Sequence, residues 1–511
     1  MARRTAVVIV ARSIAGLAWA VRCPGVWLSL IAAVKYSSFA VYRVHSYLAG
    51  SYDFGVIFQV IHGWAFHGWP TEPLNGPTAN EFGDHFAPAL AVLAPLLWIH
   101  DSPSTIAVAQ ALLISAAGVP VYLAVRRMHG PLVGSIICAT YLVCTTTQDA
   151  VGFDIHENMF TPLLLALAVE RALAGRWTTA AWIIGALVLC YEDQGLIVIL
   201  FAVWAALNRK RRHAAVLAAC GLLAMILVTA VIMPGLGGNE ASWLTRHFPY
   251  QKSLHANSFG QAIAYTLEHP RHFWHELKNL PVKWDTIWVL FAPVAFLALF
   301  SPITYLASST VALLLVSDNT THWQWNYHFF LPVTPIILIG AADALLRFER
   351  WGRWLAGFVA ARYPAVVGQL RRLRQPERRG AGFGFGWREV VAGLAVLCLC
   401  TTVAIEITPH RRPFEALWLY HDGKIHRPPA EIEAITHIAS LVPAGEPVNV
   451  TNDLGVALLV KDTEVDAPEN ARYALFDTGS RWCPAGWSQH LATLGFVVVA
   501  HDRDVVLMEK K

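Results

Sequence analysis

Long runs of apolar residues, interrupted by short polar stretches, account for most of the first 407 positions of the chain. A membrane-spanning α-helix needs about 20 such residues, or somewhat fewer where it packs against other helices. Eleven runs meet this requirement, near 25–46, 104–125, 131–149, 159–175, 177–192, 194–208, 214–234, 284–300, 303–317, 328–346 and 388–407. The pattern predicts an all-α polytopic membrane protein with these eleven transmembrane helices.

One further apolar run, residues 86–99, is shorter and contains Pro88 and Pro95. We interpret it as a helix that lies at the outer membrane interface or dips into it, rather than one that crosses. If it crossed, the basic residues that follow the next run would move to the outer side, and every later basic cluster would invert with them.

Lysine and arginine residues give the helices a direction, because they are enriched in cytoplasmic loops. The segment 45–103 contains neither residue, so we expect it to be a first outer loop with interfacial helices. The same alternation makes 235–283 a second outer loop, 347–387 a cytoplasmic linker and the N-terminus cytoplasmic, with 1–22 a retained amphipathic segment. The basic clusters that fix this direction are Arg3, Arg4, Arg12 and Arg22, Arg126 and Arg127, Arg171 and Arg176, Arg209 to Arg212, and the segment 347–388.

The last predicted span divides the chain into a transmembrane domain, 1–407, and a soluble domain, 408–511. In the second part, helix-like AEIEAITHIASLV alternates with strand-like PVNVTN and GFVVVAHDRDVVLMEK. We therefore predict a small extracytoplasmic α/β domain. It contains neither a glycine-rich phosphate loop nor an obvious nucleophile, which favours an accessory or acceptor-handling role over chemistry.

Composition supports the membrane prediction, since 55% of the residues are hydrophobic and only 14% are charged. The net charge of +4 is too small to indicate a nucleic-acid partner, and none is expected. The eight cysteines show neither CxxC nor zinc-finger spacing, so we expect no disulfide framework and no cysteine metal site.

Acidic residues and histidines gather where the apolar runs end on the predicted outer side. Ionisable groups at membrane depth cost a few kcal/mol unless they line a cavity or pair with another group. We therefore expect these clusters to converge on one outward-facing hollow. They are Asp53 in SYDFG, Asp84 and His85 in FGDHF, Asp154, His156 and Glu157 in FDIHEN, Glu192 and Asp193 in YEDQG, and Asp318, Asn319, Tyr327 and His328 in SDNTTHWQWNYH.

Each cluster also has a purely local interpretation. Asp53 could cap the helix that begins at FGVIFQV, Asp84 could cap the interfacial helix, and the EDQG stretch could form a tight turn. The spacing of Asp154 and His156 suits either a metal-ligand pair or a solvated turn. Arg43, near the outer end of the first run, fits either a lipid phosphate contact or an interface anchor.

Taken in order, five stretches resemble the DUF2079 family of bacterial membrane proteins, across roughly residues 47–346. They are YDFGVIFQ, GDHFAPALAVLAPLLWI, FDIHEN, YEDQGL, and SDN with NYHFFLPVTPIILIG. The resemblance implies a multi-pass protein of the bacterial cell (plasma) membrane. Tyr191 departs from the pattern, because a lysine is expected before the acidic pair, and the departure argues against a phosphate-binding role at that position.

More distantly, the layout resembles the GT-C glycosyltransferases, with an acid in the first outer loop, interfacial helices, and a span that ends in paired basic residues, here VRRM. This implies that Asp53 is catalytic, activating an acceptor or holding a cation. The implied donor is a sugar linked to polyprenyl phosphate, the acceptor an unidentified envelope component, and the cofactor a divalent ion such as Mg²⁺ or Mn²⁺. The candidate substrate-binding residues are Arg43, Asp84, His85, Glu192, Asp193, Asp318, Asn319, Tyr327 and His328, and the candidate metal ligands are Asp84, His85, Asp154 and His156.

Two other classes of function compete with this one. A transporter or flippase of envelope lipid-linked sugars or ions would use the acidic residues and histidines for ion coupling, and it predicts broken helices and a polar pathway that continues to the cytoplasmic side. A non-catalytic scaffold for envelope assembly would leave the acidic clusters without a role.

Overall fold

The computed structural model describes most of the chain, and the statements below concern that part alone. The predicted N-terminal amphipathic segment lies almost wholly outside it, as do large parts of the second outer loop and of the cytoplasmic linker. The described residues are 21–76, 79–237, 255–256, 259–278, 281–362, 386–406, 427–459, 463–464 and 468–511.

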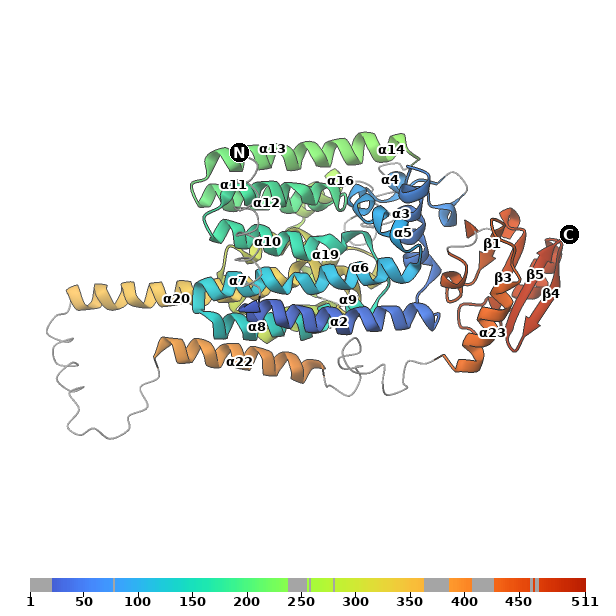
Figure 1. The fold of residues 1–511 in the computed structure, drawn as a ribbon. Helices are drawn as coiled ribbons and strands as arrows, with labels where there is room; N and C mark the ends of the chain where they lie inside the picture. The colour runs from blue at the N-terminus through green and yellow to red at the C-terminus, as the bar shows by residue number, and fades with distance from the viewer. Residues whose placement is uncertain are drawn as a thin grey trace, which may run out of the picture.

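A bundle of α-helices forms the body of the molecule, and its long members run side by side (Figure 1). Its core holds large buried side chains such as Tyr36, Phe39 and Tyr141. Close packing requires a glycine at position 25, because a Cβ atom there would come within 2.5 Å of the ring of Tyr122. The bundle helices are α2 (Pro24–His45), α6 (Pro103–Ala116), α7 (Gly118–His129), α8 (Pro131–Val143), α10 (Thr161–Leu173), α11 (Trp177–Gly185), α12 (Gln194–Leu207), α13 (Arg211–Leu227), α20 (Thr334–Arg362) and α22 (Trp387–Glu406).

Helix lengths support a multi-pass membrane protein but not the predicted count of eleven spans. In the described residues, five helices are long and apolar enough to cross a membrane by length and composition: Pro24–His45, Pro103–His129, Arg211–Gly235, His328–Val359 and Trp387–Ile405. Shorter apolar helices cover Pro88–Ile99, Pro131–Val143, Trp177–Leu189, Gln194–Leu207 and Thr304–Val316. The predicted run at 284–300 is interrupted, because Ala295 and Phe296 adopt positive φ angles of 49° and 57°.

Basic residues from two helices meet at one end of the bundle. Arg127, in the last turn of α7, donates to Glu170 of α10 at 2.8 Å, and Arg171 also pairs with this fully buried carboxylate. The pairing brings two of the predicted cytoplasmic clusters to the same end of the molecule, which agrees with the predicted topology. The orientation of this end in the membrane stays a prediction.

Short elements from the predicted first outer loop cover the opposite end of the bundle (Figure 1). The run 86–99 forms two short helices rather than a long one, and its Leu90, Leu93 and Leu97 pack against Ile57 and Ile61. The elements at this end are η1 (Ser51–Gly55), α3 (Val56–Phe66), α4 (Glu81–Asp84), η3 (Pro88–Leu93), α5 (Ala94–Ile99), α9 (Thr145–Gly152), η4 (Glu157–Phe160), α19 (Ser308–Val316), η10 (Thr320–Trp323) and η11 (His328–Val333).

The C-terminal region is an α/β domain next to this same end (Figure 1). Its sheet has the order β2-β1-β3-β5-β4, with β1 parallel to β2 and β3, and β5 antiparallel to β3 and β4. Two helices complete it, and one short helical turn, η13 (Gly455–Ala457), contacts η1. The elements are α23 (Pro429–Ser440), β1 (Pro447–Val450), β2 (Thr463–Glu464), β3 (Tyr473–Asp477), α24 (Trp487–Thr493), β4 (Phe496–Asp502) and β5 (Val505–Lys510).

Candidate active site

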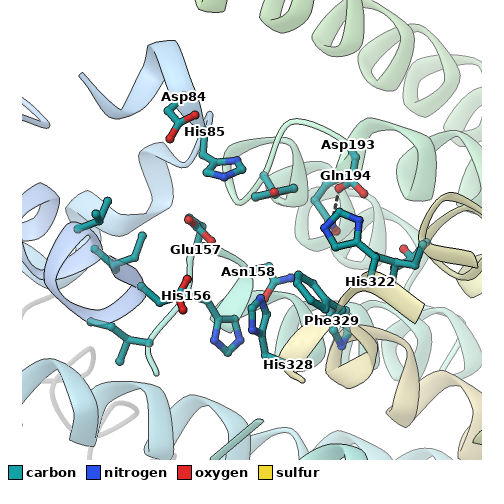
Figure 2. A pocket seen from close by; sticks show the side chains of 18 of the residues that line it. Asp84, His85, His156, Glu157, Asn158, Asp193, Gln194, His322, His328 and Phe329 are labelled. Carbon is teal, nitrogen blue, oxygen red and sulfur yellow. Dashed lines mark hydrogen bonds between the residues drawn. The ribbon is translucent and has the colours of Figure 1, made fainter. Parts of the chain in front are cut away.

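A cavity of about 260 Å³ lies where the outer-loop elements meet the helix ends. Figure 2 shows side chains from separate segments around this shared hollow, with His156 and His328 side by side and the Asp193–Gln194 pair across from them. No lysine or arginine lines it in the described part of the chain. The polar lining residues are Tyr52, Asp53, Asn75, Asp84, His85, His156, Glu157, Asn158, Tyr191, Asp193, Gln194, Thr310, His322 and His328.

Asp53 reaches the cavity from η1, a single π-helical turn between α2 and α3. Its side chain keeps access to solvent because it faces the cavity, yet protein atoms surround it on the other sides. This burial, together with the negative charge of Asp154 and Glu157, raises the pKa of Asp53 to about 7, although His85 acts in the opposite direction. A carboxylate with such a pKa exchanges protons readily at neutral pH.

Arg43 and Asp154 do not line the cavity. The Arg43 guanidinium donates to Asp154 Oδ1 at 2.7 Å, to the Phe153 carbonyl at 2.5 Å and to the Leu48 carbonyl at 3.1 Å. The other carboxylate oxygen of Asp154 accepts the Gly50 N–H at 2.8 Å. These bonds hold the loop before η1 against the FDIHEN segment, and they occupy both oxygens of the predicted metal ligand Asp154.

His85 and Glu192, which the sequence places in different clusters, form one pair. Nδ1 of His85 lies 2.9 Å from Oε1 of Glu192, and Glu192 Oε2 accepts the Phe86 N–H at 3.1 Å. Burial alone would lower the pKa of His85, but the carboxylates of Glu192, Glu157 and Asp84 outweigh it and raise the pKa well above its usual value. Tyr191, where a lysine is expected, stacks on the His85 ring with centroids 4.9 Å apart. A charged imidazolium thus lies beside the position of the expected lysine.

Two further carboxyl groups on the wall have raised pKa values. Asp193 ends the turn before α12, and burial, with the charge of Glu192, raises its pKa to about 7. Its Oδ1 accepts a hydrogen bond from Gln194 Nε2 at 2.8 Å. Burial also raises the pKa of Glu157. Asp193 therefore keeps its proton at a pH where a free carboxyl group would be ionised, which reduces the negative charge around the cavity.

His156 and His328 form a stacked pair with ring centroids 4.1 Å apart. Nδ1 of His156 lies 3.0 Å from the Asp154 carbonyl oxygen, which can only accept, so Nδ1 carries the proton. Burial lowers the pKa of His156 to about 4, and the ring is therefore neutral with a bare Nε2. Neither His156 Nε2 nor His328 Nδ1 has a hydrogen-bond partner among the described residues.

Five of the nine predicted substrate-binding residues lie outside the cavity lining: Arg43, Glu192, Asp318, Asn319 and Tyr327. Asn319 caps η10, accepting the Thr321 N–H at 3.0 Å, and Tyr327 packs edge-on against Phe153. From the same segment, His322 does line the cavity, with Nδ1 2.9 Å from Ser317 Oγ. Sequence reasoning missed His322, Asn158 and Gln194 as lining residues, although all three belong to the polar stretches that it singled out.

The predicted metal ligands do not form a preformed metal site. In the part of the chain that the structure describes, no group of three or more His, Cys, Asp or Glu side chains could hold a metal ion. Asp154 bonds Arg43 and Gly50, and His85 bonds Glu192, so two of the four candidates are already committed. The residues present therefore do not fit a divalent ion held by the protein alone.

Comparison with known proteins agrees with both resemblances drawn from the sequence. The family model for DUF2079, described as a predicted membrane protein, matches residues 43–362. The GT-C glycosyltransferase ArnT from Cupriavidus metallidurans is similar in fold in its apo state, with 15% identity, a TM-score of 0.50 and coverage of 93% of this chain and 97% of that one. Its structure bound to undecaprenyl phosphate gives 15% identity, a TM-score of 0.51 and coverage of 94% and 97%. No curated protein matches the chain.

Proposed function

Because this chain belongs to the DUF2079 family of membrane proteins and has a GT-C-like fold, we propose that it is a membrane glycosyltransferase. Its donor is a sugar carried on a polyprenyl phosphate, and its acceptor is a component of the cell envelope. The observation that carries the proposal is the placement of Asp53 in the cavity wall, with a pKa of about 7, in a cavity that His85 also lines. ArnT, with which the fold is shared, has been captured with undecaprenyl phosphate, which supports the class of donor.

In the proposed reaction an acceptor hydroxyl attacks the anomeric carbon of the sugar. A new C–O bond forms to the acceptor, and the bond between the anomeric carbon and the phosphate oxygen breaks. Asp53 takes the proton of the attacking hydroxyl as general base, a role for which a pKa near the working pH is suited. Polyprenyl phosphate leaves with the bonding electrons and stays in the bilayer.

Negative charge that develops on the leaving phosphate needs a positive partner. His85 is the group for this role, because its raised pKa keeps it charged and no lysine or arginine lines the cavity in the described residues. The raised pKa of Asp193 lowers the repulsion that an ionised carboxylate would exert on a phosphate. The described residues of the wall offer no group that would hold a divalent ion by itself, so His85 is the positive partner that the protein supplies.

An outward-facing site follows from the predicted topology. The cavity lies at the end that contacts the C-terminal domain, whereas Arg127 and Arg171 converge on Glu170 at the other end. The positive-inside rule then directs the cavity outwards. The break at Ala295 and Phe296 is a feature that a transporter also predicts, but a transporter would require a polar pathway through the bundle, whereas the polar residues of this cavity belong to the outer-loop segments and the helix ends.

The test is a transfer assay on the purified full chain in lipid nanodiscs. Lipids that co-purify are identified by mass spectrometry, and a panel of undecaprenyl-phosphate monosaccharides is scored for release of undecaprenyl phosphate. We expect Asp53→Asn to lower turnover by about 10²–10⁴-fold, the usual effect of losing a general base. Asp101→Asn, in the same outer loop but outside the cavity lining, serves as the matched control and should keep wild-type turnover. Full activity of Asp53→Asn, or an inactive wild type with every donor of the panel, would refute the proposal.

A further inference from the structure

The C-terminal domain contacts the turn that carries Asp53, and the first two backbone N–H groups of this turn are both bonded by one residue, Asn452. Its backbone carbonyl accepts the Ser51 N–H at 2.7 Å, and its side-chain Oδ1 accepts the Tyr52 N–H at 2.9 Å. Tyr52 and Asn452 are 400 residues apart in the sequence. Nothing in the sequence of TND, the tripeptide at 451–453, indicates this contact.

These two bonds satisfy groups that the π-helical turn cannot satisfy itself. Ser51 and Tyr52 are the first residues of η1, and the first N–H groups of any helix lack a partner within it. Asp53 is the next residue, so the position of its carboxylate depends on how the start of the turn is held. Asn452 thus acts as a cap that comes from another domain.

The preceding residue, Gly50, shows how closely the loop is held. Its N–H donates to Asp154 Oδ2 on the membrane-domain side. A Cβ atom at this position would lie 3.0 Å from Asp154 Oδ2 and 3.0 Å from Asn452 Oδ1, closer than most real Cβ contacts. The loop at Gly50 is therefore held between Asp154 of the bundle and Asn452 of the C-terminal domain.

The residues on either side of Asn452 are bonded within their own domain. The next residue, Asp453, accepts Arg427 Nη2 at 3.2 Å through Oδ2, and the Arg427 side chain is only 9% exposed. The Thr451 N–H donates to the Leu475 carbonyl of β3 at 3.2 Å. Val456 and Leu459, just beyond, belong to the same apolar cluster as Phe54. A rigid loop anchored to the sheet is able to fix the geometry of a neighbouring element.

We propose that Asn452 is a positioning residue through which the C-terminal domain sets the place of Asp53 in the cavity. The consequence for catalysis rests on the proposed function, whereas the contact of Asn452 with Ser51 and Tyr52 does not. An amide suits this place because it offers an acceptor without charge. An aspartate would keep the acceptor for the Tyr52 N–H but add a negative charge near Asp53, which already faces Asp154, Glu157 and His85.

The first readouts need no substrate and use the full chain in nanodiscs. Hydrogen exchange with fragmentation follows the Ser51 and Tyr52 amides, and a hydrophobic carbodiimide, which reacts with protonated carboxyl groups, titrates Asp53. Asn452→Ala should speed Tyr52 exchange roughly tenfold, the usual effect of losing one hydrogen bond, and leave Ser51 protected by the residual carbonyl. Asn452→Asp should restore Tyr52 protection and move the Asp53 labelling midpoint to higher pH. Asn470→Ala, on an exposed part of the same domain, should change neither.

The transfer assay then separates positioning from mere folding. Asn452→Ala should lower kcat with little change in the KM of the donor, and Asn452→Asp should recover kcat at high pH with its acidic limb displaced upwards. Unchanged Tyr52 exchange in Asn452→Ala, or unchanged kcat in that variant, overturns the proposal. If the variants change Tyr52 exchange and Asp53 labelling as expected but the wild-type protein transfers no sugar, the result counts against the proposed function alone.

Discussion

The imidazole of His85 and the carboxylate of Glu192 meet at 2.9 Å, although 107 residues separate them. Glu192 is fully buried and does not line the cavity, whereas His85 does. The acid therefore acts on the cavity through the ring, by fixing its orientation and by keeping it protonated. This arrangement supplies a positive charge in a wall that has no lysine or arginine among the described residues.

Removing the carboxylate of Glu192 should remove the charge of His85 at neutral pH. In Glu192→Gln the side-chain oxygen still accepts the Phe86 N–H, but the pKa of His85 falls. We expect transfer to decrease roughly 10–100-fold at pH 8, the range for a charge-assisted hydrogen bond, and less at pH 6, because a lower pH favours the protonated ring. The measurement is kcat/KM against pH, with the exposed Glu268→Gln as control. An equal loss at both pH values would contradict a role through protonation.

Transfer by the wild-type protein should depend on pH through Asp53. The base must be unprotonated, and burial raises its pKa to about 7, so kcat/KM should fall tenfold per unit as the pH drops below about 7. Above that value the rate should level off until His85 loses its proton. The residual rate of Asp53→Asn should lack this acidic limb. A wild-type midpoint near pH 4 would show that Asp53 titrates like a free carboxyl group and is not the base.

The raised pKa of Asp193 implies that this residue destabilises the fold at neutral pH. Below pH 4 the group is neutral in both the folded and the unfolded chain, but as the pH rises towards 7 only the unfolded chain readily loses the proton, so stability falls. A shift from about 3.9 to about 7 corresponds to a cost on the order of 4 kcal/mol above pH 7. Asp193→Asn keeps an acceptor for Gln194 and should raise Tm at pH 8 but not at pH 4. Exposed Asp285→Asn should have no effect, and an equal gain at both pH values would contradict the account.

The length of the apolar runs predicted the helices well where an uninterrupted run forms a single straight helix. The run at 25–46 corresponds to Pro24–His45, and the run at 388–407 to Trp387–Glu406, each within one residue. The run at 284–300 breaks at Ala295 and Phe296, where the backbone turns left-handed. Apolar side chains satisfy a straight helix and a broken one equally, so the pattern could not reveal the break.

The candidate site was predictable as a set of segments but not as a set of contacts. In the sequence, Asp53, His85 and Asp154 are all polar residues at predicted helix ends. Only Asp53 and His85 line the cavity, whereas Asp154 bonds Arg43. Which acid is committed to an arginine depends on tertiary placement. The contact of Asn452 depends on a domain whose docking no local pattern encodes.

Without donor, the protein should show no tight site for Mn²⁺. The described residues offer no group of three ligands, and Mg²⁺ or Mn²⁺ that works on phosphates is normally held by one or two carboxylates together with phosphate oxygens. Electron paramagnetic resonance of Mn²⁺ titrated into the purified apo protein should therefore show only free ion at micromolar protein. The same titration with the Asp154→Asn protein should give a spectrum indistinguishable from that of the wild type. A tightly bound ion in the wild type that disappears in this variant would restore the predicted ligand set.

The pair of Arg43 and Asp154 should be worth more to stability than to chemistry. Both side chains are mostly buried, with 14% and 12% exposed, so Arg43→Met leaves an unpaired carboxylate in the interior. Breaking a buried pair in this way costs about 3–5 kcal/mol, whereas Asp154→Asn keeps the acceptor for Gly50 and should cost less. The double variant should then be more stable than Arg43→Met alone, because the uncompensated charge is gone. A double-mutant cycle on thermal unfolding in detergent measures this coupling, and the exposed pair of Arg353 and Glu349, 3.7 Å apart, is the matched control with an expected coupling below about 1 kcal/mol. Two results together would contradict this account: a coupling of Arg43 with Asp154 as small as that of the control pair, and a higher KM of the donor in Arg43→Met. Arg43 would then contact the substrate as predicted from the sequence, and the cavity would extend beyond the lining described above.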